Sequence, residues 1–118
     1  MSPDLQITYE ILVNWAKRSV PQSYTQLSKD YEKETGDWHE PHGSWFTPLG
    51  EINVRLSTIG APAISALVIL KEKNEPGNKF WGCADNVPQR PNNEEDRIAK
   101  WLEIVNDVKK FEWPEKLP

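Results

Sequence analysis

The sequence contains little cysteine and little positive charge. Cys83 is the only cysteine among 118 residues, so no internal disulfide can form, and the chain is compatible with a reducing compartment. Lys and Arg number 14 against 18 Asp and Glu, which gives a formal net charge of −4. Residues 1–60 share this bias, with five basic and eight acidic side chains. No excess positive field therefore draws a polyanion to the molecule as a whole.

The sequence also lacks a long apolar segment. The longest apolar stretch, residues 59–70, is interrupted by Gly60, Pro62 and Ser65 and is too short to span a bilayer. The first residues, Met1–Asp4, have neither the basic region nor the apolar run of a signal peptide. We therefore expect a cytoplasmic protein.

No set of residues typical of catalysis can be recognised. His39 and His42, with Asp37 and Glu40 beside them, are the residues most typical of a metal site. Zinc requires three or four converging ligands, and a His-x-x-His pair supplies two. Cys83 would need a histidine beside it to act as a nucleophile, and its position between two small residues is more typical of packing. We predict no enzymatic activity, no cofactor and no bound metal; the alternative is a metal-assisted hydrolase that uses both histidines and a carboxylate.

Tryptophan and proline are abundant, with six and ten residues respectively. Tryptophans supply large buried area or half-exposed anchors, and prolines indicate well-defined loops and a non-helical end. The length fits one domain, residues 1–118, in which residues 113–118 form an extended tail.

Apolar periodicity predicts two helices before residue 37. Ser2 is a suitable N-cap for the first helix, with Pro3 at the first helical position, and Pro21 prevents its continuation. The second helix covers residues 25–34 and stops at Gly36. Residues 37–46 have no apolar period and form a loop that is long enough to carry function.

A third helix is predicted after this loop. Thr47 caps it, Pro48 takes the first helical position and Gly60 ends it. Its inward stripe has the spacing of one helical face. The stripe consists of Leu49, Ile52, Leu56 and Ile59.

The second half of the chain predicts a strand pair and a last helix. Residues 64–71 and 79–84 are the expected strands, joined by a turn in which Pro76-Gly77 favours type II geometry. Asn93 caps the last helix, which begins with three acidic residues. Its inward stripe consists of Ile98, Trp101, Leu102, Val105 and Val108. The whole order predicts an α+β, winged-helix-like fold of three helices, a short β-hairpin and a C-terminal helix.

Two groups of residues are candidates for binding. On the third helix, Asn53 and Arg55 are residue types that read base edges, whereas Glu51 opposes DNA. The lysines of the expected wing, at positions 71, 73 and 79, alternate with Glu72 and Glu75. Tryptophans near the surface can serve as anchors for a protein partner. The candidate anchors are Trp38, Trp45 and Trp113.

Three short motifs carry a resemblance to known proteins. Tyr24-x-x-Leu27, Leu49-x-x-Ile52 and the run Pro62-Ala63-Ile64-Ser65 follow the order found in the winged-helix part of alkylguanine–DNA alkyltransferases and alkyltransferase-like proteins. That resemblance implies a winged-helix fold, and it excludes methyl transfer because Ala63 stands in place of the methyl-accepting cysteine.

The chain is more similar to small uncharacterised bacterial and phage winged-helix-like proteins. They share a Tyr-x-x-Leu helix, a Leu-x-x-Ile helix, a Pro-x-x-Ser-Ala-Leu-Val strand and a Pro-Gly turn before an aromatic strand. The matching residues are Tyr24, Leu27, Leu49, Ile52, Pro62, Ser65, Ala66, Leu67, Val68, Pro76, Gly77, Phe80 and Trp81. The resemblance implies a setting of mobile elements or defence systems.

Acidic charge, abundant tryptophan and missing catalytic groups favour a non-enzymatic protein-binding module. An acidic surface steers the molecule toward a partner with a basic surface. We expect an inhibitor or accessory factor in phage, immunity or restriction biology. The alternative is a winged-helix DNA-binding protein that uses the third helix and the wing.

Overall fold

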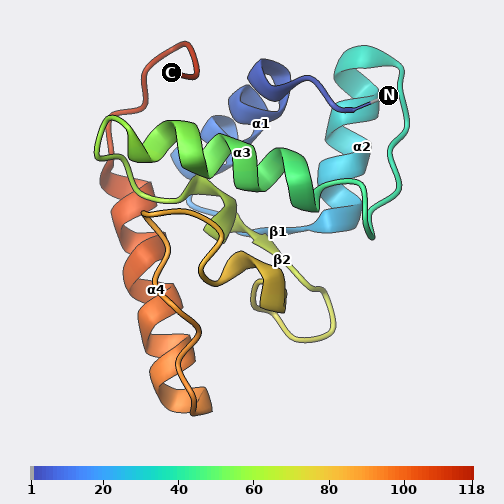
Figure 1. Ribbon diagram of the computed structural model, residues 1–118. Helices are drawn as coiled ribbons and strands as arrows, with labels where there is room; N and C mark the ends of the chain where they lie inside the picture. The colour runs from blue at the N-terminus through green and yellow to red at the C-terminus, as the bar shows by residue number, and fades with distance from the viewer. Residues whose placement is uncertain (1) are drawn as a thin grey trace.

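A computed structural model describes residues 2–118, which form four α-helices, two short 3₁₀ helices and two short strands (Figure 1). The α-helices are α1 (Leu5–Arg18), α2 (Tyr24–Thr35), α3 (Phe46–Ser57) and α4 (Glu94–Lys110). The 3₁₀ helices are η1 (Ile64–Leu67) and η2 (Asn78–Phe80), and the strands are β1 (Gln22–Ser23) and β2 (Val68–Ile69). Within the described residues, no helix is long and apolar enough to cross a membrane.

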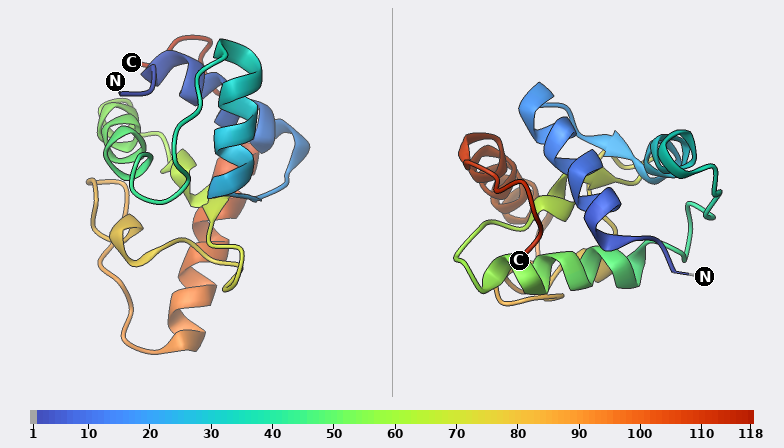
Figure 2. Two further views of the ribbon diagram at one scale, coloured as in Figure 1. Left: turned by 90° about the vertical axis from the view of Figure 1, so that its right-hand side faces the viewer. Right: turned by 90° about the horizontal axis from the view of Figure 1, so that it is seen from above.

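The short helix η1 lies at the centre of the fold. It contacts α1, α3 and α4, and its residues Ile64, Ala66 and Leu67 are fully buried. Seen from above in Figure 2, α1 runs between α4 and α2, and α3 lies along the front. The helices therefore surround a segment that is too short to form a layer of its own.

Helix caps fix most of the helix ends. Asn93 caps α4 by accepting a hydrogen bond from the Asp96 backbone N–H, as its sequence position predicts. Gly36 ends α2 with a φ of 82°, which confirms the predicted stop. The predicted start of the first helix is wrong, because Asp4 rather than Ser2 caps α1, accepting from the Ile7 N–H at 2.9 Å.

The third helix also begins and ends differently from the prediction. Phe46 is already helical, and Trp45 stands at the N-cap position without a side-chain cap, so Thr47 is not the cap. The helix ends at Ser57, which leaves Ile59 outside it and 48% exposed. The predicted inward position of Ile59 is therefore wrong.

One predicted core residue of the last helix is exposed. Leu102 is 47% exposed, because it lies outside the face of α4 that packs against the core. The buried residues follow the spacing of one helical face and are Trp101, Ile104, Val105 and Val108.

The predicted β-hairpin is not present. The segment expected as its first strand starts as η1, and β2 then pairs in parallel with β1, with Gln22 opposite Val68 and Ser23 opposite Ile69. The expected second strand contains η2 instead. A short apolar run buried on all sides has no period that separates strand from helix, which explains the error. The coarse α+β class is confirmed.

The predicted type II turn is also wrong. Gly77 has a φ of −68°, whereas type II geometry requires a positive φ at that position. The chain reverses earlier, where Asn74 takes a φ of 55° and the Leu70 N–H donates to the Glu75 carbonyl at 2.8 Å. Asn tolerates this left-handed conformation better than most residues.

A partly buried ion pair joins this turn to α4. The Arg97 guanidinium donates to both carboxylate oxygens of Glu75, at 2.6 and 3.2 Å, and Glu75 is only 9% exposed. The hydrogen bond from Arg97 holds the pKa of the Glu75 carboxyl below its usual value, although partial burial opposes this shift. A two-point contact of this kind fixes orientation as well as distance.

We expect the substitution Glu75→Gln to lower the free energy of unfolding by about 1 kcal/mol at pH 7. Because the folded-state pKa of Glu75 is lowered, its stabilisation is present above the unfolded pKa near ~4.3 and is lost as pH falls through the lower folded value. Urea denaturation at pH 7 and at pH 3 measures the difference. The matched control is Glu103→Gln, which removes a solvent-exposed ion pair to Lys100 and should change little. Equal effects of the two substitutions at pH 7 would contradict this account.

Candidate functional site

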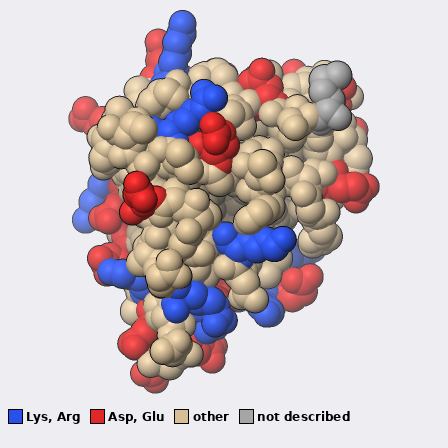
Figure 3. Space-filling view, viewed as in Figure 1, with Lys and Arg blue, Asp and Glu red and all other residues tan. Residues whose placement is uncertain are grey.

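The outward face of α3 is uncharged along one row. Phe46 and Val54 are 44% and 45% exposed, and Gly50 lies between them at helical spacing. The Lys79 ammonium lies 4.6 Å from the centroid of the Phe46 ring. Figure 3 shows this face covered mostly by uncharged residues, with basic and acidic side chains scattered over it. The face therefore carries no continuous positive stripe.

A groove runs beside this face. It has a volume of about 590 Å³ and lies between the end of α3 and the segment 82–89. Val54 and Ser57 form one wall, and Cys83, Pro88 and Gln89 contribute to the other. The groove is mixed in polarity, so it fits a side chain or a short peptide better than a phosphate backbone.

Cys83 separates this groove from a smaller hollow under Phe46. The hollow has a volume of about 20 Å³ and is also bordered by Tyr24 and Lys79. Burial raises the pKa of the Cys83 thiol, and burial likewise raises the pKa of Tyr24. Both groups are therefore protonated at neutral pH, and a protonated thiol is a poor nucleophile.

Asn53 is buried, which contradicts its predicted role at an exposed DNA-reading face. Its side chain is fully inaccessible and donates to the Ser65 hydroxyl at 2.6 Å and to the Cys83 sulfur at 3.5 Å. The Ser65 N–H donates to the Asn53 side-chain oxygen at 3.4 Å. The Asn86 side chain donates to the Asn53 backbone carbonyl at 3.1 Å. Asn53 thus joins α3 to the centre of the fold.

Glu51 and Arg55 remain on the surface of α3 but neutralise each other. Their side chains are 48% and 45% exposed and form an ion pair at 3.3 Å with the spacing of one helical turn. An exposed pair of this type contributes little to stability. Arg55 is therefore accessible, although its charge is partly offset.

Trp45 is buried, which contradicts its predicted role as an exposed anchor. It is fully inaccessible, and its indole N–H donates to the Ser28 hydroxyl at 2.8 Å. Its ring packs edge-on against Tyr31 and His39, with centroids 5.4 and 5.7 Å away. The Ser28 hydroxyl in turn donates to the His39 carbonyl. This cluster fixes the loop 37–45 against α2.

The same cluster includes His39, one of the two candidate metal ligands. The His39 ring packs against Tyr31 at 5.2 Å as well as against Trp45. Within residues 2–118, no three His, Cys, Asp or Glu side chains are close enough to hold a metal ion. The loop therefore brings no third ligand to the His-x-x-His pair, which argues against the metal-assisted hydrolase.

Of the two tryptophans in this loop, Trp38 is exposed to solvent, whereas Trp45 is buried. It is 45% exposed, and its indole N–H lies 3.4 Å from a carboxylate oxygen of Glu40. Asp37 and Glu40 flank it and are exposed. Trp38 is therefore accessible and has acidic side chains on both sides, and its role as an anchor for a protein partner stays a prediction.

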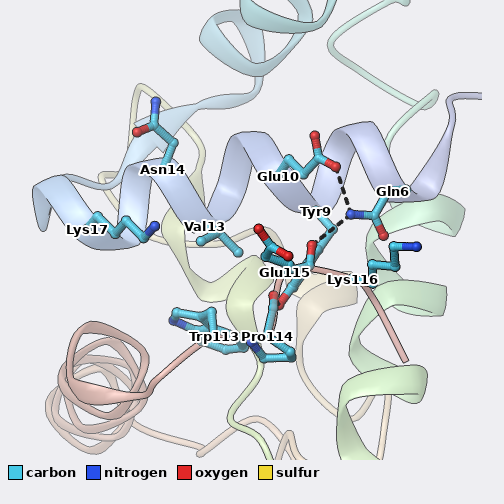
Figure 4. A pocket seen from close by; sticks show the side chains of 10 residues that line it. All are labelled: Gln6, Tyr9, Glu10, Val13, Asn14, Lys17, Trp113, Pro114, Glu115 and Lys116. Atoms are coloured by element: carbon cyan, nitrogen blue, oxygen red, sulfur yellow. Dashed lines mark hydrogen bonds between the residues drawn. The ribbon is translucent and has the colours of Figure 1, made fainter.

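Trp113 lies at a different site, in the C-terminal tail. It is half-buried, and its indole N–H donates to the Val108 carbonyl at 3.0 Å. Figure 4 shows it facing Val13 and Lys17 of α1 across a pocket of about 710 Å³. The candidate residues from the sequence therefore do not converge: Trp38, the α3 pair and Trp113 lie on separate elements.

Sequence reasoning missed the exposed row of α3. The sequence prediction places Phe46 in the preceding loop and names only polar and charged residues of the third helix as candidates for binding, so Val54 is not among them. A signal was present, since positions 46, 50 and 54 have the spacing of one helical face and carry no charge. No pattern in the sequence indicates that Cys83 lines the groove.

Comparisons with known proteins give no relative. No protein family, curated protein or solved structure matches this chain. The resemblance to bacterial and phage proteins therefore stays a prediction.

We expect Asn53→Ala to lower the free energy of unfolding by about 2 kcal/mol, because it leaves the buried polar groups of Ser65 without their partner. Chemical denaturation monitored by circular dichroism measures this loss. Arg55→Ala is the control, since it breaks only an exposed pair and should cost less than about 0.5 kcal/mol. If Asn53→Ala is as stable as Arg55→Ala, the buried network does not hold α3 in place.

Proposed function

We propose that this chain is a non-enzymatic protein-binding module that acts as an inhibitor or accessory factor in phage, immunity or restriction biology. The observation that carries the proposal is the half-exposed Trp38 ring between two exposed carboxylates. Tryptophan is enriched among residues that dominate protein–protein affinity, because it buries a large area at small entropic cost.

The position of Trp38 on a fixed base supports this role. The preceding helix ends at Gly36, and the following residue, His39, is held by Tyr31 and Trp45. The loop therefore presents the indole without having to be ordered first. Binding by a preorganised loop loses less conformational entropy than binding by a disordered one.

The charges around Trp38 favour a partner with a basic surface. The last turn of α2 and the loop that follows carry an excess of acidic side chains over the single Lys33. These acidic residues are Glu32, Glu34, Asp37 and Glu40, and all are exposed. Complementary charge speeds association and disfavours acidic partners.

The winged-helix relationship and DNA binding form the second candidate function. They are favoured by the lysines at positions 71, 73 and 79, of which Lys79 lies over Phe46 beside α3. The burial of Asn53 and the pairing of Arg55 with Glu51 leave α3 with few groups for base contact. Protein binding is therefore the better-supported function.

We expect Trp38→Ala to weaken binding to the native partner at least tenfold, because the substitution removes the central apolar contact. Partners captured from the host by wild-type and variant chains are quantified side by side, and the affinity of a purified partner is then measured. Leu102→Ala is the matched control, since Leu102 is equally exposed on α4. A partner retained equally by Trp38→Ala and lost by Leu102→Ala would place the interface on α4.

The two carboxylates beside Trp38, Asp37 and Glu40, are expected to affect the rate of association with the partner. We expect the double substitution Asp37→Asn/Glu40→Gln to slow association and to reduce its salt dependence, while dissociation changes little. Association rates at about 50 and 300 mM salt give the comparison. An unchanged salt slope would show that these carboxylates do not face the partner.

DNA binding is tested by a gel shift with random duplex near 50 mM salt, where non-specific affinity is strongest. We expect no shift at micromolar protein. A shift that Lys71→Gln/Lys73→Gln abolishes would establish the DNA-binding function instead.

A further inference from the structure

Gly50 stands in the middle of α3, where glycine is less favourable than any residue except proline. Its backbone is not in the left-handed region that favours glycine. Apart from its own helix, no atom of residues 2–118 lies within 4 Å of the point where a Cβ would stand. The fold of one chain therefore gives no reason for glycine here. The close approach of a second backbone is a reason, because a side chain at this position would prevent it.

The surface on either side of Gly50 has a projecting ring at one end and a groove at the other. Phe46, one helical turn before Gly50, is 44% exposed. Val54, one turn after it, borders the groove of about 590 Å³ between α3 and the segment 82–89, which lies beside this helix (Figure 1). An aromatic ring fits such a groove, since a cavity of about 150 Å³ is enough to bind benzene.

The two ends of this surface also carry opposite charges. At the Phe46 end, the Lys79 ammonium lies 4.6 Å from the centroid of the aromatic ring. At the Val54 end, Asp85 lines the groove. Both charged side chains are exposed, and neither belongs to an ion pair found among residues 2–118. Each is therefore available to an opposite charge outside this chain.

We propose that this surface binds a second copy of the same chain, in a two-fold symmetric dimer whose two α3 helices cross antiparallel at Gly50. The dimer surface consists of Phe46, Gly50, Val54, Lys79 and Asp85. It lies on different elements from Trp38 and goes beyond the proposed function.

Two-fold symmetry gives each feature of the dimer surface its complement. In such an interface, when one residue contacts a second residue of the other copy, the reverse contact also forms. Phe46 and Val54 are each four residues from Gly50, which is about 6 Å along the helix axis. An antiparallel crossing at Gly50 therefore places each Phe46 ring over the groove of the other copy.

The charges select the same orientation. The antiparallel crossing places each Lys79 beside Asp85 of the other copy, at both ends of the contact. A parallel arrangement would instead bring the two lysines together and the two aspartates together, and like charges across an interface oppose association. Glu51 and Arg55 beside the row already pair with each other, so they add no net repulsion.

The apolar contacts and the charges contribute differently to the dimer. An aromatic ring that enters a groove buries a large area, and such residues dominate the affinity of protein interfaces. Charges at the rim contribute more to orientation than to affinity. Because the surface is small, we expect a weak dimer that forms at roughly tens to hundreds of micromolar chain.

The first test is sedimentation velocity of the full chain from about 5 to 500 µM, where we expect a reversible monomer–dimer equilibrium. Gly50→Gln should weaken the dimer at least tenfold, because the new side chain separates the two helices. The same substitution should raise the midpoint of urea denaturation of the dilute monomer, since glutamine favours a helix more than glycine. Leu102→Gln, at an equally exposed position on α4, is the control and should leave the dimer unchanged.

The second test exchanges the charges. Lys79→Asp and Asp85→Lys, each alone, bring like charges together at both ends of the interface and should weaken the dimer at least fivefold. An equimolar mixture of the two variants should associate as well as the wild type, because each contact between the two chains then joins an acidic and a basic side chain. Recovery in the mixture identifies a contact between positions 79 and 85 of different chains.

The proposal is overturned if the chain remains a monomer at about 500 µM. It is also overturned if Leu102→Gln dissociates the dimer as strongly as Gly50→Gln does, since the interface would then lie on α4. A mixture of the two charge variants that associates no better than each variant alone would exclude the antiparallel contact.

Discussion

The fold depends on supplying hydrogen bonds to a short helix that is buried on every side. A 3₁₀ helix of four residues cannot satisfy its own backbone groups, and a buried polar group without a partner is costly. The surrounding helices supply the missing partners by side chains. Asn53 of α3 accepts from the Ser65 N–H, and Trp101 of α4 donates to the Ala66 carbonyl at 2.9 Å. These contacts fix the positions of both helices around η1.

The same contacts determine which side chains of α3 reach the surface. The polar side chain of Asn53 turns inward, and the outward row consists of Phe46, Gly50 and Val54. Asn53, a residue type that can contact DNA bases, therefore joins α3 to the core instead. The exposed Trp38 lies in the loop between α2 and α3, which is fixed by the packing of His39 and Trp45 against Tyr31.

The sequence predicts the well-capped helices better than the centre. The Asn93 cap and the Gly36 stop are local signals, and the structure confirms both predictions. The run 64–70 has no period, so its division into η1 and β2 depends on contacts with distant elements. The burial of Asn53 did have a signal, since positions 49, 52, 53 and 56 form one helical stripe in which a single residue is polar. Trp38 and Trp45 lie in one aperiodic loop, and only packing against Tyr31 decides which of them is buried.

The contacts between α1 and the tail join residues that are more than a hundred positions apart in the sequence. During synthesis on the ribosome, Gln6 and Tyr9 emerge long before residues 114–117, so their side chains bond to water while more than a hundred further residues are made. Helix α1 therefore gains these stabilising contacts late in chain growth, and its packing is incomplete until then.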